Sequence, residues 1–212
     1  MLQTITSMPP ANIFRKMASN DFPVKIRQAV RGDAPIIART IIEAVGEEIT
    51  LGFAGSRERI GLVYKLFTDL AECDDSQYSY LNTLIAETTD GEPVGAIISY
   101  DGADLRRLRE RFIQKANKIL GYDMKAEEMP DEASPDEIYL DSLCVFEPFR
   151  GHGIASRLIN AAVMSHQSSS KPSGLLVDKD NFRARRLYER LGFTQVGETP
   201  FAGTLMDHLQ RR

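Results

Sequence analysis

Residues 138–158, IYLDSLCVFEPFRGHGIASRL, contain the pattern that decides the fold. The segment from Ile138 to Val145 is apolar enough to be a strand buried on both faces. Arg150-Gly-His-Gly-Ile-Ala155 comes next, and the apolar spacing from Gly151 to about Gln167 is typical of a helix. The sequence therefore predicts a buried strand, a glycine-containing turn and a helix in direct succession.

The predicted turn has the properties of a pyrophosphate site. Gly151, Gly153 and Ala155 are small, so a ligand can approach the main chain closely. The first N–H groups of a helix have no partner within the helix, and the helix dipole adds positive potential at that end. A pyrophosphate is the natural ligand of such a turn. A glycine-rich turn before a helix is as often a simple tight turn as a phosphate site, so the motif needs support from the rest of the chain.

A dinucleotide fold is one phosphate-binding alternative. Gly151 and Gly153 begin a pattern similar to G-x-G-x-x-G, and Asp178 ends the next predicted strand. However, Ser156 replaces the third glycine, and five residues separate the strand end at Val145 from Gly151. Only 34 residues follow Asp178, which are too few to complete a doubly wound sheet. The pattern therefore favours a different phosphate-binding fold.

The apolar periodicities in the rest of the chain predict a mixed α/β fold. Strands are expected at 23–30, 80–88, 93–100, 138–145, 174–178, 193–198 and 201–209, and helices from about 34 to 49 and at 57–70, 105–120, 151–167 and 181–191. The turn at Asp90-Gly91 is typical of a β-hairpin. The acidic, proline-containing stretch 123–137 predicts a loop. We expect antiparallel pairs at both ends of the sheet, a late parallel βαβ unit, one domain over 23–212, and an irregular extension at 1–22.

Composition narrows the class of protein. The 212 residues include 30 acidic and 26 basic side chains, and this net charge of −4 argues against a nucleic-acid partner. No apolar run reaches membrane-spanning length, and the N-terminus does not resemble a signal peptide, so we expect no membrane partner. Cys73 and Cys144 are far apart, which favours a reduced, cytoplasmic setting without disulfides. No cluster has metal-ligand spacing, so no bound metal is expected.

A second motif lies downstream of the first, at Asn181-Phe-Arg-Ala-Arg-Arg-Leu-Tyr-Glu-Arg-Leu-Gly-Phe193. Arg150–Ala155 resembles the R/Q-x-x-G-x-G/A turn of the GNAT superfamily of N-acetyltransferases. The second motif resembles that family's N-x-x-A-x-x-x-Y-x-x-x-G-F helix. The two motifs occur in the family's order and span about 138–193, and together they are far more specific than either alone. Relative to compact members of the family, about 103–137 is an insertion.

The resemblance implies a GNAT-like fold, with a central mixed sheet, antiparallel N-terminal strands, flanking helices and a splayed parallel pair that forms the cofactor cleft. Acetyl-coenzyme A is the implied co-substrate. Its pantetheine arm would pair with the main chain of Leu143, Cys144 and Val145. Its pyrophosphate would bind the N–H groups of Arg150, Gly151, His152, Gly153, Ile154 and Ala155. Asn181 would contact the cofactor arm or cap its own helix.

Other features of these segments have simpler interpretations. The Arg150 side chain is expected to frame the turn. The second motif also contains Arg183, Arg185, Arg186 and Arg190, which are interpreted as a solvated helix face, with a clamp for the cofactor's 3′-phosphate as the alternative. Cys144 is interpreted as a packing residue, because a cysteine inside a strand usually packs and the family transfers the acetyl group without a covalent thiol intermediate.

Three residues are candidates for catalysis. Tyr188 holds the family's tyrosine position and is the candidate general acid, although its place in a helical apolar stripe also fits a core residue. Asp141 is the first candidate general base, because a charged residue within a buried strand is unusual unless it faces a cleft or is paired. Glu137, just before that strand, is the second.

The expected function is acetyl transfer to a primary amine of a small molecule or peptide, by direct attack in a ternary complex. The alternatives are a protein N-terminal or lysine acetyltransferase and a non-catalytic acyl-CoA-binding regulatory module. Glu43, Glu47 and Glu48 would either attract a cationic amine or form a solvated helix face. The inserted helix 105–120 is a candidate for covering the acceptor site, for a homodimer contact, or for ordinary core packing.

Overall fold

The computed structural model describes residues 22–212, so the predicted N-terminal extension lies outside the described residues apart from Phe22. One seven-stranded sheet runs through the molecule in the order β1-β2-β3-β4-β5-β7-β6. Its strands are β1 (Val24–Gln28), β2 (Thr83–Thr88), β3 (Pro93–Asp101), β4 (Ile138–Val145), β5 (Ser173–Val177), β6 (Thr194–Phe201) and β7 (Thr204–Arg211). All neighbouring pairs are antiparallel except β4 with β5. The predicted mixed α/β class is confirmed.

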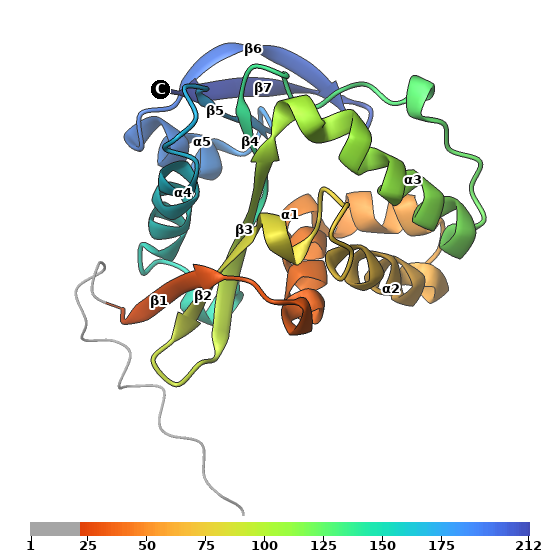
Figure 1. Ribbon diagram of the computed structural model, residues 1–212, viewed down its shortest axis with the longest axis horizontal. Coiled ribbons are helices and arrows are strands. Elements are labelled where there is room, and N and C mark those ends of the chain that lie inside the picture. Colours follow the sequence, from red (N-terminus) through yellow and green to blue (C-terminus); the bar gives the residue numbers. More distant parts are fainter. Residues whose placement is uncertain (1–21) are drawn as a thin grey trace, which may run out of the picture.

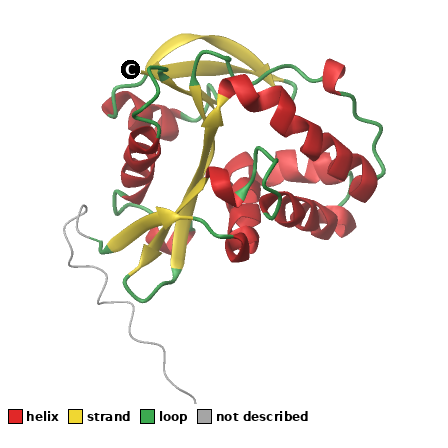
Figure 2. Cartoon of the chain, viewed as in Figure 1, coloured by secondary structure: helices red, strands yellow, loops and turns green. Residues whose placement is uncertain are grey.

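Five α-helices flank this sheet (Figures 1 and 2). They are α1 (Ala34–Ala54), α2 (Ile60–Ala71), α3 (Leu105–Leu120), α4 (Ile154–Ser165) and α5 (Phe182–Arg190). The first three lie on one side of the sheet and the last two on the other (Figure 1). Side-chain alternation along β3 explains the two layers, since Ile98 packs with α1–α3 while Ile97 packs with α4.

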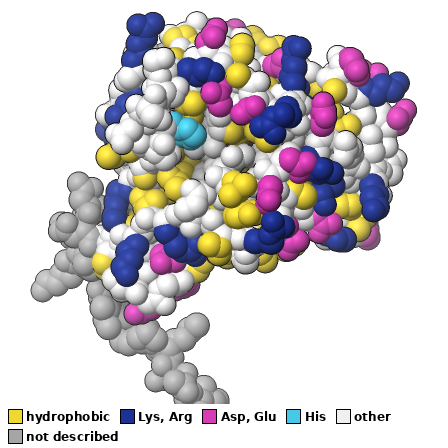
Figure 3. Space-filling view, viewed as in Figure 1, with side chains coloured by type: hydrophobic (Ala, Val, Ile, Leu, Met, Phe, Trp, Pro, Cys, Tyr) yellow, Lys and Arg dark blue, Asp and Glu magenta, His cyan; other side chains and the backbone are white. Residues whose placement is uncertain are grey.

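The inserted helix α3 is part of the core. Its amphipathic stripe, Leu105, Leu108, Phe112, Ala116 and Leu120, is buried in the cluster that also contains the apolar faces of α1 and α2. Figure 3 shows basic and acidic side chains interspersed on the outer surface of this side of the molecule. The ion pairs Arg106–Asp131 and Arg111–Asp75 belong to this surface. Of the three interpretations offered for this helix, the structure therefore supports core packing.

The parallel pair β4 and β5 separates soon after it begins. Only Ile138 with Ser173 and Tyr139 with Gly174 pair between these two strands. On its other edge, β4 continues to pair with β3, but the register shifts so that Leu140 faces Ser99 and Leu143 faces Ile97. Asp141 and Ser142 thus lie in a β-bulge, a feature that redirects side chains. From residue 141 onward the edge of β4 on the side of β5 is unpaired, because the two strands diverge and leave a gap within the sheet.

The first helix differs from its predicted form. Its apolar stripe is continuous in sequence, but Gly46 has φ 85 and ψ 169, and this non-helical residue kinks α1. Before the kink, Ile37 and Ile41 are buried in the core. Val45 and Ile49, which belong to the same stripe, instead line the gap beside β4. The kink thus lies within the part of α1, residues 43–49, that borders the cleft, while Ala54 at the end of the helix is again buried in the core.

Three further observations bear on the class of protein. No helix within residues 22–212 combines the length and apolar character that crossing a bilayer requires. Cys73 and Cys144 are both free thiols. Among the residues that the structure describes, no three His, Cys, Asp or Glu side chains are grouped to hold a metal ion.

Candidate active site

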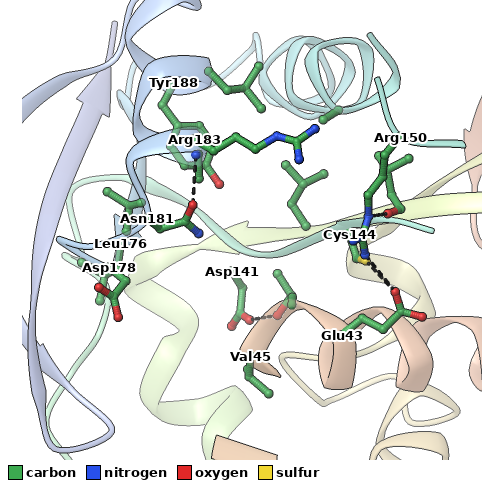
Figure 4. A pocket seen from close by; sticks show the side chains of 18 of the residues that line it. Glu43, Val45, Asp141, Cys144, Arg150, Leu176, Asp178, Asn181, Arg183 and Tyr188 are labelled. Carbon is green, nitrogen blue, oxygen red and sulfur yellow. Dashed lines mark hydrogen bonds and ion pairs between the residues drawn. The ribbon is translucent and has the colours of Figure 1, made fainter. Parts of the chain in front are cut away.

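A cleft of about 1070 Å³ occupies the gap where β4 and β5 separate. Its walls come from the part of α1 around the kink, the open edge of β4, the turn before α4, the end of β5, and α5. Figure 4 shows α5 with Tyr188 and Asn181 on one side and Cys144 with Arg150 on the other, with Asp141 between them. Most of the residues predicted from the two sequence motifs therefore meet in one cavity.

The turn before α4 presents free main-chain N–H groups to this cleft. Gly151 and Gly153 have φ values of 87 and 73, a conformation that side-chain-bearing residues rarely adopt. Within residues 22–212, the N–H groups of Gly151 to Ser156 donate to no protein acceptor. Arg150 Nε donates to Val145 O at 2.7 Å, so this side chain frames the turn as expected. The result is a set of unpaired donors at a helix N-terminus, suited to an anion.

The open edge of β4 forms the floor of the cleft. Leu143, Cys144 and Val145 line it, while their opposite edge pairs with β3. An unpaired strand edge can bind an extended, amide-bearing ligand as an additional strand. The Cys144 thiol lies 3.4 Å from Glu43 Oε2, and burial together with this carboxylate raises its pKa to about 11. The thiol is therefore protonated at neutral pH, in agreement with a packing role.

Two residues of the second motif belong to the wall that α5 forms, across the cleft from Cys144 and Arg150. Asn181 Oδ1 accepts a hydrogen bond from Ala184 N at 3.1 Å, so this residue caps α5 while also lining the cleft. Tyr188 lines the cleft and packs edge-on against Phe193, with ring centroids 6.0 Å apart. Burial raises the pKa of Tyr188 to about 12. Its phenol therefore stays protonated at all physiological pH values and is available as a donor.

Asp141 lies in the bulge of β4 and faces the cleft. Its carboxylate accepts hydrogen bonds from Ser142 Oγ at 2.7 Å, Tyr100 OH at 3.0 Å and Gln77 Nε2 at 3.4 Å. Burial raises the pKa of Asp141 above its ordinary value, although these three donors act in the opposite direction. A carboxylate in a cleft with a raised pKa is a good proton acceptor near neutral pH.

Sequence reasoning missed a second carboxyl group beside Asp141. Glu132 lines the cleft, and its side chain accepts from Arg109 Nη2 and, at 3.3 Å, from Gln77 Nε2. Arg109 is only 2% exposed and Gln77 only 3%, so this network is internal. Burial raises the pKa of Glu132 despite the guanidinium. The one available signal was an arginine within the apolar stripe of a predicted helix, which implies a buried acidic partner.

Two predicted residues do not line the cleft. Glu137 is 0% exposed, and its carboxylate accepts from His208 Nε2, Gln210 Nε2 and Ser134 N, each at 2.8 Å. It fits closely against Gly174, where a Cβ atom would overlap its carboxylate. The ring of His152 packs on Phe22, with ring centroids 5.1 Å apart, behind the turn. Glu137 therefore joins β4 to β7, and His152 contributes its main chain.

We expect Glu137→Gln to destabilise the fold without touching the cleft. A glutamine amide would place a donor against His208, Gln210 or Ser134 N, and an unsatisfied buried group costs about 1–3 kcal/mol. Thermal denaturation should show a midpoint lowered by about 3–10 °C. The exposed Glu128→Gln is the matched control and should leave the midpoint unchanged. Equal midpoints for both variants would contradict a structural role for Glu137.

The glutamates of α1 are placed differently from one another. Glu43 lines the cleft but is already paired, with Arg39 Nε at 2.7 Å and Arg150 Nη2 at 3.3 Å. Glu47 pairs with the exposed Arg57, and Glu48 is exposed. Glu47 and Glu48 therefore form the solvated face, while Glu43 helps to hold Arg150 beside the turn.

Comparison with known proteins shows that this chain is similar to acetyltransferases. The profile described as the acetyltransferase (GNAT) family matches residues 62–193. A probable N-acetyltransferase of Mycobacterium tuberculosis is 38% identical over 87 residues, which cover 39% of this chain and 49% of that protein. The chain thus spans about half the length of this curated relative.

Solved structures extend the likeness to nearly the whole chain. One described as an acetyltransferase aligns with a TM-score of 0.70 at 30% identity, covering 89% of this chain and 98% of that one. An N-acetyltransferase from Staphylococcus aureus Mu50 aligns with a TM-score of 0.68 at 22% identity, covering 88% and 99% of the two chains. The second likeness shows the shared fold.

Proposed function

Because the chain belongs to the GNAT family of acetyltransferases, we propose that it transfers an acetyl group from acetyl-coenzyme A to a primary amine by direct attack in a ternary complex. One observation carries this proposal. The same cleft contains the free N–H groups of the turn before α4, the open edge of β4, and the side chains of Tyr188 and Asp141. Anion binding, binding of an extended amide chain, and acid–base chemistry are thereby brought together.

The residues of the cleft fit coenzyme A. The unpaired N–H groups from Gly151 to Ser156 would hold the diphosphate, because they are donors at a helix N-terminus. The edge from Leu143 to Val145 would pair with the pantetheine amides, and Asn181 would contact the same arm. When bound, the coenzyme supplies an acetyl thioester. We extend the proposal to one acetyltransferase domain over residues 23–212, since the inserted α3 and its loop supply Arg109 and Glu132 to the site.

The acceptor amine must first lose a proton. With a reference pKa of roughly 10.4, a primary amine costs about 4 to 5 kcal/mol to deprotonate at neutral pH. Asp141 accepts this proton in our proposal, directly or through water. Its raised pKa makes it a stronger base than an ordinary carboxylate, and the donors from Ser142, Tyr100 and Gln77 fix its orientation.

Two other groups complete the transfer. A main-chain N–H on β4 near Val145 stabilises the negative charge that develops on the carbonyl oxygen. As the bond from nitrogen to the acetyl carbon forms, the carbon–sulfur bond breaks, and the Tyr188 hydroxyl gives its proton to the departing sulfur. A thiol has a pKa near 8.5, and the Tyr188 phenol, with a pKa of about 12, is protonated when it is needed.

The part of the cleft beyond Asp141 would receive the acceptor. Val45 and Ile49 of the kinked α1 line it, together with the rings of Tyr78 and Tyr139 and the carboxyl group of Glu132. Burial and the nearby carboxyl groups raise the pKa of both tyrosines well above 10, so these walls are neutral. We propose an amine on an apolar body, since apolar walls and two carboxyl groups suit such a molecule.

The test of this function is a panel of amines with acetyl-coenzyme A, monitored for free thiol. Small amines, peptides with free N-termini and lysine peptides form its three arms. Turnover with any of them supports an N-acetyltransferase, and the preferred arm identifies the acceptor class. Tight binding of the coenzyme without turnover in any arm would overturn the catalytic proposal in favour of a regulatory module.

We expect Gly151→Ala to weaken coenzyme binding at least about tenfold, because a side chain at φ 87 strains the turn that presents the N–H groups. Gly91→Ala is the matched control, since Gly91 has φ 85 and, like Gly151, open space around its Cβ position. Both variants should lose about 1–2 kcal/mol of stability. Calorimetric titration with acetyl-coenzyme A should distinguish them, and equal affinities would contradict the proposed role of the turn.

A further inference from the structure

An internal network links the proposed base to the inserted helix α3. Arg109 of α3 is only 2% exposed and pairs with Glu132 and, at 3.1 Å, with Asp131. Its Nη1 atom also donates to Met129 O at 3.3 Å. These three partners belong to the loop that leads from α3 to β4 (Figure 1). A buried guanidinium therefore fixes the inserted loop where Glu132 lines the cleft.

Gln77 connects this loop to Asp141. Its Nε2 atom donates to Glu132 Oε1 at 3.3 Å and to Asp141 Oδ2 at 3.4 Å, so one amide nitrogen bridges two carboxyl groups. Gln77 is only 3% exposed, and its Oε1 atom has no hydrogen-bond partner within residues 22–212. An unpaired buried oxygen is costly, so packing alone does not explain an amide at this position.

The surroundings of the two carboxyl groups offset only part of their charge. The ionisable side chains that face them from the neighbouring elements are Tyr78, Tyr100, Tyr139 and Arg109. Burial and the nearby carboxyl groups raise the pKa of each tyrosine well above 10, so the phenols are neutral. Arg109 is the charged neighbour, and Asp131 shares it. Two ionised carboxylates therefore exceed the positive charge of the site, and the ionisation of each opposes that of the other.

We propose that Glu132 and Asp141 act as one coupled carboxyl pair that receives the proton of the acceptor amine, an inference that rests on the proposed function. Arg109 and Gln77 are the positioning residues of this pair. The acceptor enters as an ammonium ion, whose positive charge completes the balance of the site. Its N–H bond then breaks, the proton binds to the Asp141 carboxylate, and the electron pair remains on nitrogen for attack on the thioester.

Carbon-13 NMR titration of the side-chain carboxyl signals tests the pair without a readout of activity. In the unmodified chain, the signals of both groups should show two steps, because coupled groups titrate together. In Glu132→Gln, Asp141 should show one step, about one pH unit below the upper step of the unmodified chain, since a neighbouring negative charge has been removed. Asp131 still pairs with Arg109 in this variant, so the guanidinium is not left without a carboxylate.

Arg109→Met should have the opposite effect and raise the upper step by about one pH unit, because the offsetting positive charge is lost. The matched controls are Glu128→Gln, in the same loop, and Arg107→Met, at an exposed position of the same helix. Each control removes the same charge outside the network and should leave both steps unchanged. If Arg109→Met does not fold, the comparison of Glu132→Gln with Glu128→Gln decides alone.

A merely structural role for Glu132 would leave the titration of Asp141 unchanged in Glu132→Gln. That result, or a single step in the unmodified chain, would overturn the inference. The acidic limb of kcat/KM, measured with the best amine of the panel, should move to lower pH in Glu132→Gln. Turnover with an unmoved limb would overturn the coupled pair and leave the proposed function intact. Coupled titration without turnover of any amine would overturn the proposed function, and with it the proton-accepting role of the pair.

Discussion

Tyr188→Phe is expected to lower kcat by at least about a hundredfold, the usual contribution of a positioned general acid. The change removes only the hydroxyl group, which has no hydrogen-bond partner within the described residues, and keeps the ring that packs against Phe193. The fold and the affinity for acetyl-coenzyme A should therefore be preserved. Steady-state kinetics with the best acceptor amine, together with a calorimetric titration, separates these two effects.

The matched control for this variant is Tyr64→Phe. Tyr64 lies on α2 outside the cleft, and its hydroxyl donates to Pro35 O at 3.1 Å. This variant should keep the kcat of the unmodified chain. Full turnover of Tyr188→Phe across the pH range would show that Tyr188 is a packing residue of α5.

Asp141→Asn is expected to lower kcat/KM by about a hundredfold at neutral pH, because the amide cannot accept the proton of the amine. In the unmodified chain, activity should fall as the pH drops through the pKa of Asp141. Burial raises that pKa, so this acidic limb should lie at a higher pH than for an ordinary carboxylate. The limb should be absent in Asp141→Asn and unchanged in the exposed control Asp136→Asn. An unaltered acidic limb in Asp141→Asn would exclude this residue as the base.

Whereas activity should fall as the pH drops, the folding stability that Asp141 contributes should fall as the pH rises. Since the folded pKa of Asp141 is above its unfolded value, the unfolded chain binds fewer protons in the interval between them. Folding stability contributed by this group therefore falls as the pH rises through that interval. Thermal denaturation as a function of pH should show this loss of stability in the unmodified chain and a smaller one in Asp141→Asn, which has no carboxyl group at this position. The same dependence of the midpoint on pH in both proteins would contradict this assignment.

Local patterns predicted the parts of the fold that lie close together in sequence. The buried strand, the turn and the helix from Ile138 to about Gln167 needed only hydrophobic spacing and two glycines. The structure differs by placing α4 at Ile154–Ser165, which starts three residues later and ends two residues earlier than predicted. The motif at 181–193 was equally informative, since Asn181 caps the helix that carries Tyr188. Such features are encoded within a few residues, so one sequence suffices to find them.

The acceptor end of the cleft could not be predicted in this way. Hydrogen bonds join Gln77 to Glu132 and to Asp141, which are both more than 50 positions further along the sequence. Arg109 reaches Glu132 of the acidic loop only because α3 packs beside it. Glu137 was instead predicted to be catalytic, because it lies just before β4, but the structure gives it a different role. Its partners come from β7, more than 70 positions away, and they make it a buried structural group.

Titration of the ¹⁵N-labelled protein with coenzyme A, followed through its backbone amide signals, tests the central claim most directly. The free N–H groups of Gly151, Gly153 and Ala155 should show the largest shifts and should saturate together with signals from the edge of β4. Signals from the hairpin at Gly91 should not move. Binding that leaves the signals of the turn before α4 unchanged, or the absence of any shift at saturating coenzyme, would contradict the proposal that this turn holds the diphosphate.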